Sequence, residues 1–349
     1  MKNKRYILIG MLVFSSVGIV IQQIINRNNT TDPVPGSCTI FSASIGDKVL
    51  FGNNEDYYKT KTYLWTDPAT DQNYGCIYLG FKDYSHQGGI NEKGLCFDAN
   101  ALPESRINLY AELIPAPHYK PPYENYVIWA PVLILRKATT VEEAIEIAGT
   151  YQRENWYPDS GSINYQLNFA DANGDAVVIS VDTKGELAFT RKKKDEKYLI
   201  STNYNKANPK NALEYPCERY TKTEEMLRAV INENDLTVDY FKTILDSVHQ
   251  EGVFSRTLYS NIFDLQNGII YLYHQYQFGE VVALDVEEEL AKGKINIRIK
   301  DLFSKETVEK ASGEYVLSIF LLCLSIVAGT GAMIAAIHYI KKRKLKTDK

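Results

Sequence analysis

The stretch that decides the fold is CTIFSASIGDKVLFGNNED, residues 38–56. Two runs rich in β-branched and aromatic residues, 38–45 and 47–56, flank turn residues, and this pattern is typical of short β-strands. The preceding segment NRNNTTDPVPGS (26–37) is polar and contains Pro and Gly, which indicates an unstructured linker. We therefore expect the folded domain to begin at Cys38.

Further along the chain, the predicted elements come in blocks. Strands at 62–67 and 75–81 precede a helix at 124–138, interrupted at Pro131, and a helix at 140–152 in which Thr140 and Glu143 have capping-box spacing. The blocks that follow are strands at 163–171, 176–182, 186–191 and 197–203, helices at 217–231 and 237–248, and strands at 257–264, 268–276 and 280–286. This grouping predicts an α+β layered architecture, with antiparallel sheets and helices on their outer faces, in one domain over residues 38–305.

The charge of the chain is unevenly distributed. Residues 1–37 carry +3 and residues 314–349 carry +4 against a total of −4, so the middle of the chain carries −11. An acidic middle argues against nucleic acid as a partner, because phosphate binding depends on clustered Lys and Arg. The five Cys show no CxxC spacing, and HExxH, P-loop, GxSxG and strand-following GxGxxG motifs are missing, so we expect neither a metal nor a cofactor.

Both ends of the chain contain apolar segments. Residues 6–25 follow the charged start MKNKR, as in a signal peptide or signal anchor, whereas residues 315–340 form 26 residues without Lys, Arg, Asp or Glu. A buried core helix is the alternative for 315–340, but the basic block KKRKLK follows at once and favours a span. We expect a juxtamembrane linker at 306–314 before the span and a basic tail at 341–349 after it. The positive-inside rule predicts that this tail is cytoplasmic and that the domain lies on the other side of the cell membrane.

Cys38 is the candidate nucleophile, because it stands just after the linker and leads directly into a strand. Taken alone, its position also fits a small buried hydrophobic residue. A lipobox Cys and a papain-like Cys paired with a distant His are further alternatives, although nothing in the surrounding sequence supports them.

Residues 38–56 resemble the opening of the N-terminal-nucleophile (Ntn) amidases of the choloylglycine hydrolase and penicillin V acylase family, whose mature chains begin with Cys-Thr and continue to Gly-Arg-Asn-x-Asp. HQGGINEKGLCFDANALP (86–103), STNYN (201–205) and CERY (217–220) resemble later family motifs in the same order. STNYNK followed by an Arg also resembles the acid ceramidase branch. The resemblance implies a four-layer αββα sandwich, with residues 1–37 removed autocatalytically or by a processing protease.

The resemblance also implies roles for individual residues. Cys38 is the nucleophile, and its own freed α-amine serves as general base. Asp56 orients that amine, Asn203 donates to the oxyanion, Asn100 lies near the oxyanion or substrate, and Arg219 supports the nucleophile region. Asn53 stands where the family has Arg, at a position expected to contact substrate. This replacement puts bile-salt-like and penicillin-like substrates in doubt.

The predicted function is therefore a membrane-tethered cysteine amidohydrolase of EC 3.5.1 type. It would cleave a linear C–N bond in a small N-acylated amine or amino acid through a thioester. A catalytically silent, membrane-anchored binding domain on the same fold is the alternative. The expected partners of the protein are a small amide substrate and the membrane, and no nucleic acid is expected. A homo-oligomer remains possible from the sequence.

Overall fold

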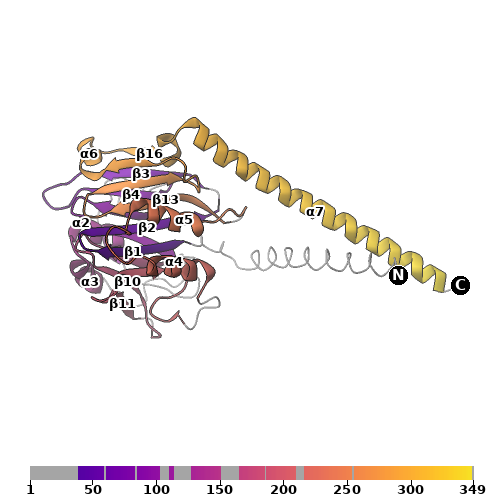
Figure 1. Cartoon of the computed structure of the whole chain (residues 1–349), viewed down its shortest axis with the longest axis horizontal. Helices are drawn as coiled ribbons and strands as arrows, with labels where there is room; N and C mark the ends of the chain where they lie inside the picture. The colour runs from indigo at the N-terminus through magenta and orange to yellow at the C-terminus, as the bar shows by residue number, and fades with distance from the viewer. Residues whose placement is uncertain are drawn as a thin grey trace. The chain divides into compact units, whose positions relative to one another are not determined.

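The computed structural model describes residues 38–58, 60–82, 85–102, 110–113, 127–150, 165–184, 186–209, 216–253 and 255–347 (Figure 1). The side chains of 110–113, 127–129 and 341–347 are not described. The expectations for the N-terminal apolar segment and for the linker at 26–37 lie outside the described residues.

One antiparallel sheet contains the N-terminal stretch of the domain. Its six strands lie in the order β12 (Tyr198–Ser201), β1 (Thr39–Ile45), β2 (Lys48–Tyr57), β13 (Arg256–Asp264), β14 (Ile269–His274) and β15 (Val282–Asp285). Strands β1 and β2 form a hairpin in which Ile45 pairs with Lys48, and Gly46 takes the positive φ of +58° that the two-residue turn requires. The hairpin places β1 next to the edge strand β12 and β2 next to β13.

A second antiparallel sheet packs against the first. Its eight strands lie in the order β11 (Leu187–Arg191), β10 (Ala176–Val181), β9 (Tyr165–Ala170), β6 (Cys96–Ala101), β5 (Ser85–Asn91), β4 (Cys76–Phe81), β3 (Thr62–Asp67) and β16 (Asn296–Arg298). A separate pair consists of β7 (Tyr110–Leu113) and β8 (Val127–Trp129). Strand β6 and all of β5 except Ser85 lie in the motif at 86–103, for which no strand is predicted from the sequence.

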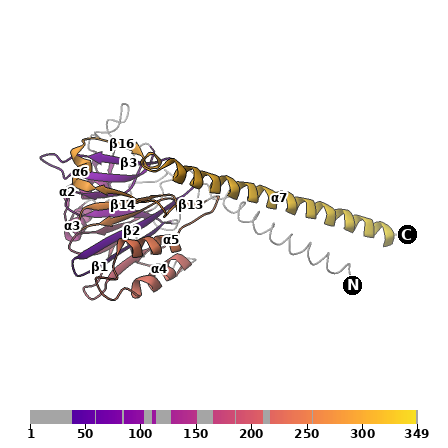
Figure 2. The same cartoon turned by 45° about the horizontal axis from the view of Figure 1, so that its top comes forward.

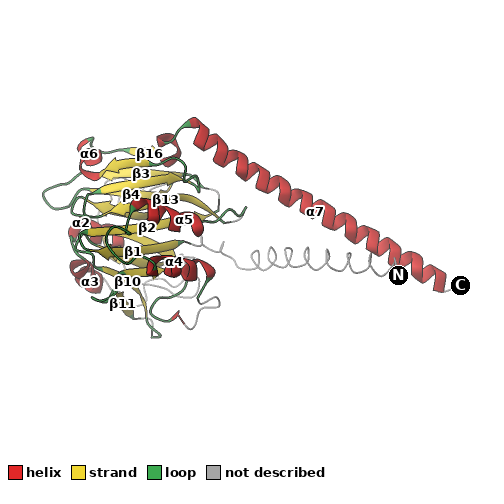
Figure 3. Cartoon of the chain, viewed as in Figure 1, coloured by secondary structure: helices red, strands yellow, loops and turns green. Residues whose placement is uncertain are grey.

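Helices cover the outer face of each sheet, and strands and helices are distinguished in Figure 3. Helices α4 (Glu218–Arg228) and α5 (Val238–Ser247) pack on the six-stranded sheet, and α2 (Ala130–Lys137) and α3 (Val141–Thr150) pack on the eight-stranded sheet (Figure 2). A third apolar cluster fills the space between the sheets. Two short helices, α6 (Val286–Ala291) and the 3₁₀ helix η2 (Ile299–Leu302), complete the domain. The predicted α+β class with antiparallel sheets is confirmed.

The prediction that Pro131 interrupts a helix at 124–138 is wrong. Residues 127–129 form strand β8, and α2 begins at Ala130, so Pro131 lies in the first helical turn. A proline is tolerated there because the first N–H groups of a helix have no intrahelical partner. The capping box of α3 is confirmed: Glu143 N donates to Thr140 Oγ1 over 3.2 Å, and Thr140 N donates to Glu143 Oε2 over 3.2 Å.

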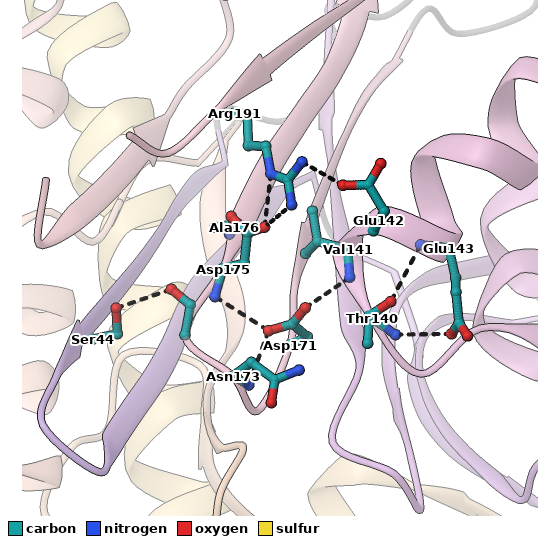
Figure 4. Close-up of polar contacts among 11 residues, drawn as sticks. Ser44, Thr140, Val141, Glu142, Glu143, Asp171, Asn173, Asp175, Ala176 and Arg191 are labelled. Atoms are coloured by element: carbon teal, nitrogen blue, oxygen red, sulfur yellow. Dashed lines mark hydrogen bonds and ion pairs between the residues drawn. The ribbon is translucent and has the colours of Figure 1, made fainter. Parts of the chain in front are cut away.

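A buried carboxylate joins the turn between β9 and β10 to the start of α3 (Figure 4). Asp171 accepts hydrogen bonds from Val141 N at 2.8 Å, Asn173 N at 2.9 Å and Asp175 N at 3.2 Å. Arg191 then bridges Asp175 and Glu142 on the surface. These contacts fix the outer helix to the edge of the eight-stranded sheet.

The C-terminal helix α7 spans Lys305–Thr347 without interruption, so the predicted linker at 306–314 is helical. Within the domain, Val308 packs against the cluster between the sheets, and Ala311 is buried. The chain divides after Ala311, and residues 312–349 belong to a second unit. One helix in the described part of the chain, over 305–340, is long and apolar enough to cross a membrane by length and composition, and few of its residues are buried.

Candidate active site

Cys38 precedes β1 and is buried between the sheets. Its Sγ lies 3.6 Å from Glu55 Oε1 and 3.9 Å from the carbonyl oxygen of Asp56, both on the neighbouring strand β2. Because side chains alternate along a strand, Cys38 shares the inner face with Ile40, which belongs to the cluster between the sheets. The thiol therefore points between the two sheets.

Two side chains hold the backbone of Cys38. Arg219 Nη1, from α4, donates to the Cys38 carbonyl oxygen over 2.7 Å and to Thr39 Oγ1 over 2.7 Å. Asn100 Nδ2, from β6 of the other sheet, donates to the same carbonyl oxygen over 3.3 Å. The start of β1 is thus fixed from the helical layer and from the facing sheet.

Asn100 is itself held in one orientation. Its Oδ1 accepts hydrogen bonds from Ser201 Oγ at 2.6 Å and from Asn168 Nδ2 at 3.0 Å. Gln166 Nε2 donates to Ser201 Oγ over 2.8 Å and extends the network along β9. All four side chains are buried, so the network holds the amide of Asn100 in one orientation.

Asn203 follows β12, and Arg219 connects it to Cys38. Asn203 Oδ1 accepts from Arg219 Nη2 over 3.1 Å, and Asn203 Nδ2 donates to the carbonyl oxygen of Ala101 over 2.9 Å. One guanidinium therefore sets the positions of both Cys38 and Asn203.

Asp56 lies on the opposite face of β2 from Glu55. Its Oδ1 accepts from Thr257 Oγ1 over 2.5 Å, whereas its Oδ2 is buried and has no hydrogen-bond partner among the described residues. Burial raises the pKa of Asp56 to about 7, and the positive charge of Arg219 opposes that rise. One oxygen of the Asp56 carboxylate is thus available to a further donor.

Two further carboxyl groups lie in the site that the sequence analysis does not single out. Glu55 and Asp98 are both buried, and burial raises the pKa of each well above its usual range, with repulsion from Asp98 contributing at Glu55. Asn53 Nδ2 lies 3.5 Å from Glu55 Oε2, so the predicted substrate-contacting residue is adjacent to this pair. Strand alternation could have suggested both, because Glu55 shares a face with Asn53 and Asp98 shares one with Asn100.

The surroundings of the thiol favour its protonated form. Burial raises the pKa of Cys38 well above its usual range, and the charges of Glu55 and Asp56 raise it further. In an uncleaved chain the nitrogen of Cys38 is an amide and cannot accept the thiol proton. The arrangement would therefore hold an unprocessed nucleophile in its unreactive form.

The structure brings the predicted residues together in one place. Cys38, Asn100, Asn203 and Arg219 are joined by hydrogen bonds, and Asp56 lies within the electrostatic reach of Arg219. Thr257 was missed, and only the pairing of β13 with β2 reveals it. No group of three His, Cys, Asp or Glu side chains in the described ranges could hold a metal ion.

Part of the chain matches a known protein family. Residues 131–277 match the sequence profile of the acyl-coenzyme A:6-aminopenicillanic acid acyl-transferase family, a range that includes Asn203 and Arg219. No curated protein matches the chain.

Solved structures share the fold. A variant of conjugated bile acid hydrolase from Clostridium perfringens is 20% identical with a TM-score of 0.53, over 75% of this chain and 96% of that chain. Penicillin V acylase from Agrobacterium tumefaciens is 16% identical with a TM-score of 0.51, over 72% of this chain and 87% of that chain.

The paired antiparallel sheets and these structural neighbours define the class: the domain has the fold of the Ntn hydrolases. Within that class the chain resembles the choloylglycine hydrolase and penicillin acylase family, as the motifs at 38–56 and 86–103 predict.

Proposed function

We propose that this protein is a cysteine Ntn amidohydrolase that cleaves a linear carboxamide bond of a small N-acylated amine or amino acid. One observation carries the proposal: Arg219 and Asn100 converge on the carbonyl oxygen of Cys38, at 2.7 and 3.3 Å. Such contacts position the first residue of a processed chain. The similarity to a bile acid hydrolase and to a penicillin V acylase supports a hydrolase acting on C–N bonds other than peptide bonds.

The chemistry requires that the bond between Ser37 and Cys38 be cleaved. The freed α-amine then accepts the thiol proton, and the thiolate attacks the amide carbonyl. The C–N bond breaks as the α-ammonium gives its proton to the leaving amine, and the acyl group remains on Sγ as a thioester. Water hydrolyses the thioester to a carboxylate and restores the thiol.

The neighbouring side chains support this sequence of steps. The unpartnered Oδ2 of Asp56 can accept a hydrogen bond from the α-ammonium and favour its charged form. Asn203 donates to the oxyanion that develops on the substrate, with its amide oriented by Arg219 and Ala101. No cofactor enters the scheme.

The membrane arrangement is part of the proposal. The span at 315–340 and its basic tail would hold the processed enzyme by its C-terminus, with the domain on the extracytoplasmic side. This placement follows from composition and length.

The alternative, a catalytically silent binding domain, is favoured by one observation. Glu55 lies 3.6 Å from the thiol, and its negative charge disfavours the thiolate. The two proposals differ in the state of the N-terminus.

The test is intact-mass measurement of the membrane protein, followed by incubation with N-acyl amides and trapping of the acyl-enzyme. We expect a chain that begins at Cys38, an acyl adduct on Cys38 and release of amine. A Cys38→Ala variant is the control and should form no adduct. An uncleaved chain, or a cleaved chain that hydrolyses no amide, would contradict the proposal.

A further inference from the structure

We propose that Glu55 and Asp98 form the specificity site of this enzyme and select a substrate that carries an ammonium or guanidinium group close to the scissile amide. This inference rests on the proposed function, because the site is defined by its distance from Cys38.

The two carboxyl groups come from different sheets and point into the space between them. Along β2, Phe51 belongs to the cluster between the sheets, so Asn53 and Glu55 share its face. Along β6, Cys96 belongs to the same cluster, so Asp98 and Asn100 share its face. Glu55 is also the carboxylate next to the nucleophile, 3.6 Å from Sγ.

This pair has no cationic partner within the described residues. Neither Glu55 nor Asp98 forms an ion pair with a described Lys, Arg or His, although both are buried. Burying a charge without a counter-charge is unfavourable, and two such groups together also repel each other. An arrangement of this kind is suited to a ligand that supplies the missing positive charge.

Other polar atoms around the pair point to the same kind of ligand. The β2–β13 register places Tyr259 opposite Glu55 and Asn261 opposite Asn53, on the same inner face. The atoms that are buried without a hydrogen-bond partner among the described residues are Asn53 Oδ1, Asp98 Oδ2, the Tyr259 hydroxyl and both amide atoms of Asn261.

Acceptors outnumber donors in this set, so a group with several N–H donors satisfies it best. A substrate carboxylate or phosphate would add acceptors and a repelling charge. A hydroxyl group would supply a single donor and leave the carboxyl pair without a counter-charge. The chemistry of the site therefore favours an ammonium or a guanidinium.

A bound cation would also affect the nucleophile. Negative charge next to Sγ opposes ionisation of the thiol, and a substrate cation held by Glu55 and Asp98 would cancel that effect. The substrate would thus assist the proton transfer from Cys38 to its α-amine. The alternative cation for the Glu55–Asp98 pair is the α-ammonium of Cys38 itself. In that case the pair would give no preference for cationic over neutral substrates.

The first experiment compares substrates of matched size on the processed, full-length protein. The probes are 6-aminohexanoyl, heptanoyl and adipoyl 4-nitroanilides, together with N-hexanoyl-1,4-diaminobutane and N-hexanoylpentylamine. We expect kcat/KM to be about 10²-fold higher for the cationic member of at least one pair, the scale of a desolvated charge pair. The ratio should fall to near 1 in Glu55→Gln/Asp98→Asn and stay unchanged in Glu92→Gln, which removes one exposed carboxylate.

The second experiment does not depend on amide hydrolysis. The rate of Cys38 modification is measured by mass spectrometry with methanethiosulfonates that carry either a trimethylammonium or a sulfonate group. We expect the cationic reagent to react at least about 10-fold faster, and the double variant to lose this preference.

The outcomes separate the two proposals. Selective labelling without hydrolysis of any amide would contradict the proposed function and leave the cation site standing. Hydrolysis without charge preference in the wild-type enzyme would overturn the site. If kcat/KM in the double variant fell equally for cationic and neutral substrates, the cation site would also be overturned. The α-ammonium of Cys38 would then be the group that Glu55 and Asp98 bind.

Discussion

Arg219 Nη1 lies 2.7 Å from the carbonyl oxygen of Cys38, although the two residues are 181 positions apart in sequence. The same guanidinium contacts Asn203 Oδ1 over 3.1 Å. The planar fork of an arginine can make both contacts at once, because its N–H groups diverge at fixed angles. The proposed nucleophile, Cys38, and the proposed oxyanion donor, Asn203, are therefore positioned by one side chain.

The first prediction concerns this fork. Arg219→Lys keeps the charge but cannot reproduce both contacts, so kcat should fall by about 10²-fold, the range for a mispositioned catalytic group. Steady-state kinetics measure the change, and thermal unfolding checks the fold. Arg228→Lys on the exposed side of α4 is the control and should keep its rate. An unchanged kcat in the Arg219→Lys variant would show that the fork is dispensable.

The second prediction concerns Asn203. Asn203→Ala should lower kcat by about 10²–10³-fold with little change in stability, as expected for loss of one oxyanion donor. Asn205→Ala is the matched control, because Asn205 Nδ2 donates to the Val181 carbonyl oxygen over 2.7 Å and supports the same loop. If both variants lose stability alike and Asn203→Ala keeps its kcat, Asn203 is a loop residue without a catalytic role.

The third prediction concerns pH and stability. The pKa values of Glu55 and Asp98 are raised in the folded chain by burial, so the folded state binds more protons than the unfolded state. Their contribution to stability is complete below the unfolded pKa of about 4 and is lost as pH rises through the folded values.

Thermal unfolding at a series of pH values tests this. We expect the melting temperature of the wild-type chain to fall more steeply above pH 4 than that of Glu55→Gln/Asp98→Asn. For each pKa unit by which folding raises a carboxyl group, its replacement by an amide should increase the free energy of unfolding by about 1.4 kcal/mol at a pH above the folded pKa, relative to pH 4. Parallel curves for the two proteins would contradict the prediction, because they would mean that folding does not raise the pKa values of Glu55 and Asp98.

The fourth prediction concerns the junction between the domain and α7. A chain that ends at Gly313 keeps Val308 and Ala311, which pack in the domain, and should be a soluble, active enzyme. A chain that ends at Ser304 loses both contacts and should be less stable by about 1–3 kcal/mol, the scale of burying one aliphatic side chain. Denaturant unfolding and activity distinguish the two. An inactive Gly313 truncate would show that the helix does more than tether.

Much of the fold follows from local patterns in the sequence. The runs at 38–45 and 47–56 predict β1 and β2 because β-branched and aromatic residues fit a pleated, buried surface. By contrast, β5 contains Gly88 and Gly89 and resembles a loop, yet a Cβ at Gly88 would lie 2.3 Å from Asp98 Oδ2. The Asp98 carboxyl group occupies the space of that Cβ, and the pattern of one strand cannot reveal the side chain of its neighbour.

The residues of the candidate site that stand in sequence motifs could be predicted, whereas the pair formed by side chains from two different sheets could not. Cys38, Asn203 and Arg219 stand in recognisable segments, and the structure brings them together. The juxtaposition of Glu55 and Asp98 arises from the packing of β2 against β6, which leaves no signature at either position. The bulge between Thr257 and Tyr259, opposite Asp56 and Glu55, is likewise visible only in the pairing of β13 with β2.

The alternation of side chains along β2 separates two roles within a single strand. Asp56 faces the helical layer with Thr257 and Arg219, whereas its neighbour Glu55 faces the interior with Tyr259. In the proposed enzyme, a substitution at 53 or 55 would change the groups next to the substrate and leave Asp56 in place, but a substitution at 55 would also change the charge beside the Cys38 thiol. Natural variation or directed evolution that adapts this strand to new amides would therefore also change the ionisation of Cys38 whenever it acts at 55.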